Sequence, residues 1–333
     1  METGKFIISL DFELQWGMID KINEQSSYRK NICKVHEILP QLLSIFRKYH
    51  VKSTFAQVGM SFFCDYQGLY EFIEKRKEET QGKKELTYEN NLLNAYAHLD
   101  EVEKDDDKYF FANHLLKLIQ SDKENHEIAT HTFSHYYCLE PGQTIIQFEE
   151  DCRRANLIAQ ENDIHLESLV FPRNQINENY LSICNKYGYK VVRGNEKAWM
   201  YRASNGKENT LWKRLFRLMD AYVNLSGHNS YDVSKLKVCH DVVLLPASRF
   251  LRPYSTSLSF LEGLRLRRIK KDMTYAANRG EIFHLWWHPH NFGNNTEENF
   301  AVLVKILEHY ACLNKKYGFT SATMNEFSKK NIP

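Results

Sequence analysis

The hydrophobic and polar positions of residues 6–13, FIISLDFE, follow the two-residue period of a strand. Side chains of an extended strand point alternately to its two faces. The even-numbered positions are all apolar, whereas Asp11 and Glu13 follow each other on the opposite face. The pattern therefore predicts a strand that presents two carboxylates side by side at its end.

Similar strands and intervening helices follow along the chain. Helical spacing of apolar residues predicts helices at 29–49, 144–163, 180–187 and 298–317, and Gly188 and Gly318 stand where the last two should stop. The predicted strands are 51–59, 126–131, 168–173, 189–194, 242–246, 281–288 and 319–323. Strands that alternate with helices at this pitch indicate a parallel α/β fold.

Residues 61–125 depart from this alternation. They contain the charged stretches EKRKEETQGKK and DEVEKDDDK, with only short apolar stretches between them. We interpret this segment as an insertion or lid after the second strand, and not as a separate domain.

Composition narrows the class of protein. The chain has 333 residues, of which 43% are hydrophobic, enough to bury a large core. Its 44 Lys and Arg balance 42 Asp and Glu, which gives no reason to expect nucleic acid, and no apolar run reaches the roughly twenty residues of a membrane span. Seven scattered cysteines without CxxC spacing and a start without an export signal predict a cytoplasmic protein with reduced thiols.

A carboxylate pair that points inward is costly unless a counter-charge compensates it, and a metal ion is the obvious candidate. His131 and His135 of HTFSH would share a face if the chain turned helically after the strand, and they lie where barrel sites form. With Glu13 they make two imidazoles and one carboxylate, a ligand set of catalytic zinc sites. Asp11 would then remain free for proton transfer.

Two further strand ends carry candidate site residues. Arg173 follows SLVFP, where a guanidinium can pair with a carboxylate and keep it ionised. His288 ends the strand of EIFHLWWHPH because it precedes Pro289, which makes it a candidate general acid. His284 lies one layer deeper and is expected to be a hydrogen-bonded core residue.

Four motifs, LDFE, HTFSH, FPRN and WWHPH, occur in an order that resembles the polysaccharide deacetylases of the NodB-homology type. The resemblance implies one domain over 1–333, a distorted (β/α) barrel with seven or eight parallel strands, and the segment 61–125 inserted within it. It also implies roles for the residues above: Asp11 as general base, Arg173 as its partner, His288 as general acid, and Glu13, His131 and His135 as metal ligands.

The sequence departs from the family pattern in three places. Its two acids are separated by Phe12, its arginine motif lacks the usual Pro-Tyr, and its aspartate motif has only loose candidates in Asp241 and the turn Ser248–Arg249. The expected function is removal of an N-acetyl group from a nucleotide-linked, lipid-linked or oligomeric amino sugar during cell-surface polysaccharide assembly. Zinc is the expected ion, and the oxyanion would rest on it together with a backbone N–H near 133–136.

Two alternatives remain open at this point. The same metal and base would serve a hydrolase that opens a cyclic amide or ureide. The altered acidic motif also fits a glycan-binding scaffold that has lost catalysis.

Overall fold

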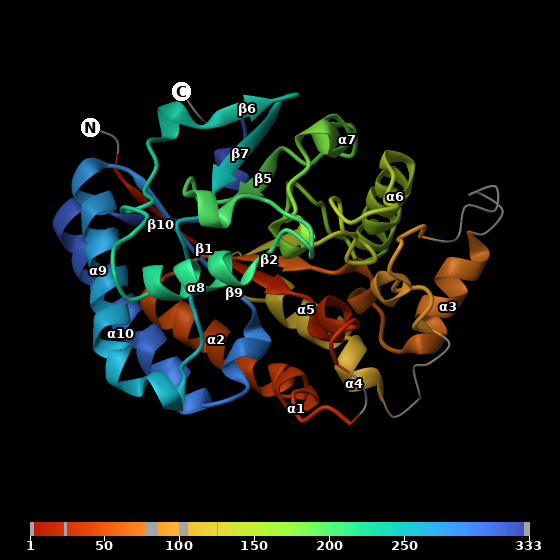
Figure 1. The fold of residues 1–333 in the computed structure, drawn as a ribbon, viewed down its shortest axis with the longest axis horizontal. Helices are drawn as coiled ribbons and strands as arrows, with labels where there is room; N and C mark the ends of the chain where they lie inside the picture. The colour runs from red at the N-terminus through yellow and green to blue at the C-terminus, as the bar shows by residue number, and fades with distance from the viewer. Residues whose placement is uncertain (1–2, 23–24, 77–85, 100–105, 125, 330–333) are drawn as a thin grey trace.

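The computed structural model describes residues 3–22, 25–76, 86–99, 106–124 and 126–329. Within them the strands form one curled sheet in the order β6-β7-β5-β4-β3-β2-β1-β9-β8, with β10 added to β1 (Figure 1). The strands are β1 Lys5–Phe12, β2 Thr54–Gln57, β3 Glu127–Thr130, β4 Ser168–Leu169, β5 Val191–Gly194, β6 Lys237–Cys239, β7 Val242–Pro246, β8 Arg249–Phe250, β9 Ile282–Trp287 and β10 Thr320–Ala322. All the pairings are parallel except that of β6 with β7.

A two-residue step between β7 and β8 joins the two sides of the sheet. The N–H of Ala247 donates to the Gly194 carbonyl of β5, and the next N–H, that of Ser248, donates to the His284 carbonyl of β9, both at 2.8 Å. The chain thus crosses from one side to the other within one peptide unit. The result is the distorted, mostly parallel barrel that the sequence predicts.

The side chains of β1 point alternately into two different hydrophobic clusters. The even-numbered residues of β1 belong to a large apolar layer between the sheet and the helices, and Ile7 belongs to a smaller cluster inside the barrel. That inner cluster also includes Ala56, Ala129 and Val191. Because both faces of most strands are buried, the strand segments read as continuous apolar runs.

The helices confirm most of the predicted periodicity. Their bounds are α1 Arg29–Cys33, α2 Val35–Tyr49, α3 Tyr66–Lys75, α4 Asp107–Phe110, α5 Asn113–Gln120, α6 Ile145–Glu161, α7 Leu181–Lys186, α8 Leu211–Asp220, α9 Glu262–Arg279 and α10 Thr296–Tyr317. Gly318 ends α10 with a left-handed φ of 68°, as expected. The pattern did not predict α8 or α9, and α9 packs beside α10 (Figure 1).

The described part of the segment 61–125 belongs to the main core. Leu69, Leu116 and Ile119 are buried there, and the Trp16 indole N–H donates to the Phe110 carbonyl at 2.9 Å. Residues 77–85, 100–105 and 125 lie outside the described residues. None of the described residues of 61–125 lines the pocket at the strand ends, so its interpretation as a lid finds no support in them. No described helix is both long and apolar enough to span a membrane.

Candidate active site

The end of β1 carries a buried ion pair. Asp11 points into the barrel, and both of its carboxylate oxygens accept from the guanidinium of Arg193 on β5, at 2.5 and 2.8 Å. Burial by itself raises the pKa of Asp11, but the adjacent Arg193 outweighs it and lowers the pKa overall. Asp11 is therefore held as a carboxylate in a fixed orientation.

The prediction that Arg173 is the partner of Asp11 is wrong. Arg173 follows β4 in a short turn with a φ of 53°, and there it pairs with Asp20 at 2.5 Å and lies over the Tyr137 ring. Arg193 sits inside β5 instead, where alternation aims it inward on the same face as Val191. The available signal was a single charge in the otherwise apolar strand VVRG.

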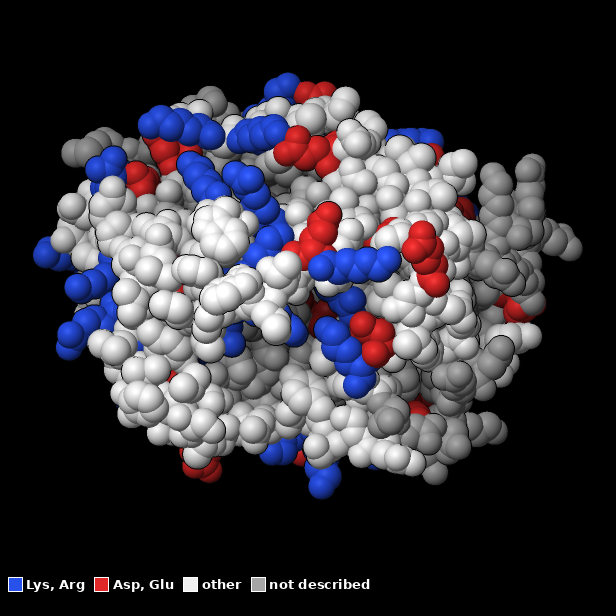
Figure 2. Space-filling view, viewed as in Figure 1, with Lys and Arg blue, Asp and Glu red and all other residues white. Residues whose placement is uncertain are grey.

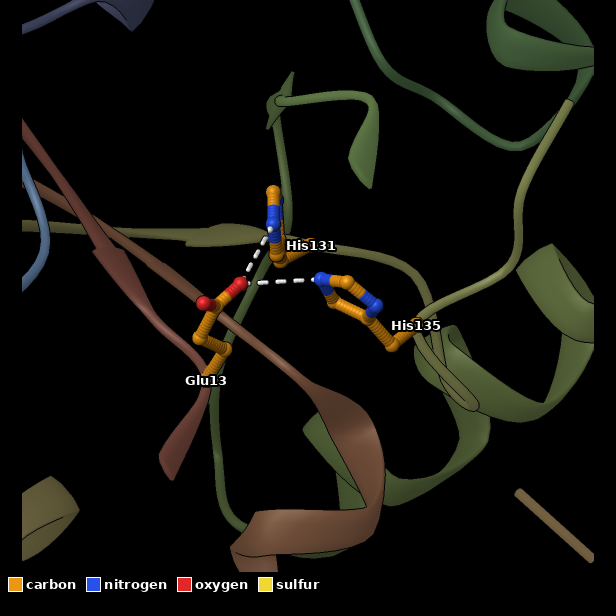
Figure 3. A group of neighbouring side chains, drawn as sticks. All are labelled: Glu13, His131 and His135. Carbon is orange, nitrogen blue, oxygen red and sulfur yellow. Dashed lines mark hydrogen bonds and ion pairs between the residues drawn. The ribbon is translucent and has the colours of Figure 1, made fainter. Parts of the chain in front are cut away.

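The three predicted metal ligands meet beside this pair (Figure 3). The Oε2 of Glu13 lies 2.9 Å from Nε2 of His135 and 3.4 Å from Nε2 of His131, and one ligand atom from each residue falls within 4.8 Å of the others. Nδ1 of His131 donates to the Val170 carbonyl at 2.8 Å, which leaves the Nε2 lone pair facing the group. That Nε2 is buried and has no hydrogen-bond partner among the described residues.

Protonation states also suit a metal. Burial alone raises the pKa of Glu13, but nearby His288, His131 and His135 lower it well below its usual range. Burial lowers the pKa of His135 to about 4. An ionised carboxylate and a neutral imidazole are the forms that bind a cation, so these residues fit a divalent metal.

The loop that carries the two histidines is not helical. Thr132 and His135 adopt left-handed φ values of 65° and 58°, so the ligands converge through a tight loop and not through the expected helical turn. Asp151 of α6 holds this loop by accepting from the backbone N–H of Phe133 at 2.6 Å and of Ser134 at 3.0 Å. The carboxylate of Asp151 thereby acts as an anchor for the ligand loop.

This anchoring limits which backbone N–H could make the expected oxyanion contact. The N–H groups of Phe133 and Ser134 are occupied by Asp151, and that of Tyr136 donates to the Thr132 hydroxyl at 2.6 Å. Only the N–H of His135 is left in the stretch 133–136 without such a bond among the described residues.

His288 faces the same group from the end of β9. Its Nε2 lies 3.7 Å from Asp11 Oδ2 and 3.5 Å from Glu13 Oε1, and its ring stacks on His290 at 5.0 Å between centroids. His284 lies deeper and contacts the Ser9 hydroxyl through Nε2 at 2.8 Å, which confirms it as a hydrogen-bonded core residue.

A pocket of about 630 Å³ opens over these residues at the carboxyl ends of the strands. Seven Lys and Arg and four Asp and Glu line it, and much of its wall comes from residues 195–217. One of these acids, Glu196, is buried, and burial raises its pKa to about 7.

The loose candidates for the aspartate motif lie in different places. Asp241 is exposed, pairs with Lys329 at 2.6 Å and stands at the opposite end of β7 from the pocket, which excludes it. Ser248 accepts from the His284 N–H at 2.9 Å. Arg249 lines the pocket and is held by Asp220 and Asp272.

Comparisons with known proteins agree with this geometry. A family model described as polysaccharide deacetylase matches residues 27–192, which include the HTFSH and FPRN motifs and exclude β1 and β9. No curated protein matches the chain.

Solved structures share the fold at low identity. A protein from Mycobacterium smegmatis assigned to the polysaccharide deacetylases has a TM-score of 0.56 at 12% identity, over 93% of this chain and 84% of that chain. One from Pseudomonas aeruginosa PAO1 with the same assignment has 0.52 at 10%, over 97% and 89%. The allantoinase PuuE has 0.52 at 8%, over 97% and 88%.

Proposed function

Because this chain belongs to the polysaccharide deacetylase family, we propose that it is a metal-dependent hydrolase that removes the N-acetyl group of an amino sugar. The observation that carries the proposal is the convergence of Glu13, His131 and His135 beside a carboxylate that Arg193 keeps ionised. We place the reaction in cell-surface polysaccharide assembly within the cytoplasm. The seven free cysteines, two of them exposed, support that location.

A divalent ion, zinc in the first instance, held by the three ligands would polarise the amide carbonyl and lower the pKa of a water molecule. Asp11 is positioned to accept the proton of that water as it adds to the amide carbon. Arg193 and Ser9 hold the Asp11 side of the site, since Nη1 of Arg193 also donates to the Ser9 hydroxyl at 3.1 Å. The base therefore does not have to reorient during the reaction.

His288 acts at the opposite side of the substrate amide. Its ring is about a fifth exposed and faces the pocket, so it can reach a leaving nitrogen above the ligand group. When the C–N bond breaks, His288 gives its proton to the departing amine, and acetate and the free amino sugar leave. Asp11 and His288 thus divide the roles of base and acid.

The pocket favours a sugar over a small cyclic substrate. Its volume and its open, polar rim suit a substrate larger than a single five-membered ring. Of the aromatic residues near the motifs, Trp286 lines the pocket, while the Trp16 and Tyr136 side chains are buried in the core. Of these three residues, Trp286 is therefore the one that a sugar ring could stack on.

The test combines elemental analysis with acetate release from N-acetylglucosamine and its oligomers. We expect about one ion per chain in the wild type, and loss of both ion and activity in the H131A/H135A double variant. His165→Ala, an exposed histidine outside the pocket, is the matched control and should behave as wild type.

Other outcomes would select the two alternatives. Hydrolysis of allantoin with no acetate release from any amino sugar would establish a cyclic ureide hydrolase. Sugar binding that persists in a chelator, without turnover and without bound metal, would establish an inactive glycan-binding scaffold.

A further inference from the structure

Helix α8 exposes a stripe of large apolar side chains to solvent. Leu211 is 78% exposed, Trp212 69%, and Leu215 and Met219 43% each, whereas the one buried residue of the helix is Asp220. The four exposed residues recur at helical spacing and form one stripe, which we call the α8 face. A surface helix normally turns such a stripe toward the core, whereas the stripe of α8 faces solvent.

The basic side of α8 turns toward the pocket. Arg214 and Arg217 line the pocket together with Arg202 and Arg252. Among the described residues none of these four forms an ion pair with a carboxylate. Within the described part of the chain, Arg217 donates to neutral acceptors, the Met200 carbonyl at 3.2 Å and the Asn209 amide oxygen at 2.5 Å.

Other arginines of the same pocket are already compensated. Arg173 pairs with Asp20, and Arg249 with Asp220 and Asp272. For Arg217, burial and the nearby charges of Arg214 and Arg252 lower the pKa more than nearby Tyr201 and Glu196 raise it. Uncompensated guanidinium groups held together in a partly buried wall are disfavoured until an anion joins them.

The chemistry of that anion follows from its receptor. Guanidinium groups bind phosphate oxygens in pairs, and several of them around one wall suit a phosphate or diphosphate group. The same pocket holds the proposed deacetylation centre. A phosphate attached to the amino sugar would therefore reach these arginines while the acetamido group lies at the ligand group.

The α8 face indicates which kind of molecule the phosphate is attached to. Apolar exposure continues beyond the helix at Val223, 56% exposed, and Leu225, 46% exposed. Figure 2 shows mostly uncharged surface over α8, with Lys and Arg around the hollow beside it. An exposed Trp and Leu stripe with basic residues beside it is the pattern of a helix that lies in a membrane interface.

A second copy of the chain fits this surface less well. A two-fold contact through α8 would bring each patch against itself. The exposed Lys207 and the partly exposed Lys213 of the two copies would then approach each other, and like charges oppose such a contact. Anionic lipid headgroups would complement both lysines.

We propose that the α8 face seats this protein on an anionic membrane surface, and that its substrate is an amino sugar joined to a membrane lipid through a phosphate or diphosphate that Arg214 and Arg217 bind. This inference rests on the proposed function and specifies its substrate class. The lipid remains in the bilayer while the sugar enters the pocket beside α8.

The first experiment measures co-sedimentation with vesicles of phosphatidylcholine, with and without phosphatidylglycerol. We expect the wild type to bind the anionic vesicles and the W212S/L215S variant to bind at least about tenfold more weakly. Ile146→Ser is the matched control, because Ile146 is an apolar residue of α6 that is 56% exposed and lies away from α8. It should bind as the wild type does.

The second experiment measures acetate release from three substrates: polyprenyl-diphosphate N-acetylglucosamine in those vesicles, UDP-N-acetylglucosamine, and free N-acetylglucosamine. We expect kcat/KM to be highest for the lipid-linked sugar. The R214Q/R217Q variant should lower the ratio of kcat/KM for the lipid-linked sugar to kcat/KM for the free sugar by about tenfold or more.

Three results would overturn the inference: no vesicle binding by the wild type, binding that W212S/L215S leaves unchanged, or a W212S/L215S variant that converts a dimer to a monomer. Equal use of UDP-linked and lipid-linked sugar without vesicle binding would assign the arginines to a soluble nucleotide sugar instead.

Acetate release from free N-acetylglucosamine in any of these cases would leave the proposed function intact. Vesicle binding without acetate release from any sugar would reject the proposed function and retain the docking surface.

Discussion

The carboxyl end of the barrel and helix α8 both depart from the usual division between apolar interior and polar surface. In the barrel, Asp11 is buried, but Arg193 binds both of its oxygens. At α8, Leu211 and Trp212 face solvent, while Arg214 and Arg217 line a pocket and form no ion pair with any carboxylate that the structure describes. Arg193 compensates the buried charge of Asp11 within the chain, whereas no described residue compensates the arginines or covers the apolar stripe of α8. Such an uncompensated surface indicates a binding partner from outside the chain.

The largest effect is expected at the compensated centre. Asp11→Asn keeps the size of the side chain and can accept one of the two hydrogen bonds from Arg193, but it removes the proposed base. We expect kcat to fall by about 10²–10⁴, the range for loss of a general base, while bound metal stays near the wild-type level. Acetate release and elemental analysis on the same preparation check this. Wild-type turnover in the variant would exclude Asp11 as the base.

Arg193→Met tests compensation directly. Removing one partner of a buried pair leaves Asp11 as an isolated buried charge, so the free energy of unfolding should fall by about 3–5 kcal/mol. Arg173→Met is the matched control, because its pair with Asp20 is partly exposed and should contribute about 1 kcal/mol or less. Urea denaturation of both variants measures the two losses. Equal losses would contradict the distinction between the arginines.

The carboxyl group of Glu196, at the carboxyl end of the barrel, is buried without a full set of hydrogen-bond partners. Its Oε1 is buried without a hydrogen-bond partner among the described residues, and burial raises its pKa from 4.5 to about 7. Between these values the folded state holds the proton more tightly than the unfolded state, so this group lowers stability as pH rises through that window.

The Glu196→Gln variant lacks that titration. Relative to wild type it should gain stability between pH 5 and pH 8, by up to about 3 kcal/mol at roughly 1.4 kcal/mol per pKa unit. Thermal denaturation at the two pH values measures the gain. A stability difference that is the same at both would show that Glu196 ionises normally.

The smallest effect is expected on the α8 face. Leu211→Ala should change the free energy of unfolding by less than about 0.5 kcal/mol, because a side chain that is 78% exposed contributes little packing. Leu10→Ala in the buried face of β1 should cost about 2–5 kcal/mol. Denaturation curves compare the two. A loss above 2 kcal/mol for Leu211 would show that α8 packs against the protein after all.

Much of the fold and the ligand set could be predicted because local rules govern them. The two-residue period of β1 places Asp11 inward, Glu13 follows directly after the strand, and a strand that ends at Thr130 delivers His131 to the same end of the barrel. Such statements need only the period of a strand and the direction of a parallel sheet.

The partner of Asp11 could not be predicted in this way. Arg173 and Arg193 both follow or end a strand, and the choice depends on a left-handed turn at one and an inward register at the other. The conformation of the loop that carries His131 and His135 likewise depends on Asp151. This residue of α6 lies sixteen positions after His135 in the sequence. These are long-range contacts that periodicity does not contain.

The sequence by itself determined the parallel α/β architecture, the ligand triad and the candidate acid and base, because strand alternation and motif order act locally. The tertiary structure alone decided which guanidinium holds Asp11, which residues wall the pocket, and that α8 turns its apolar side outward. A helix has the same periodicity whichever face is buried, so only the packing of the whole chain shows which side meets the protein.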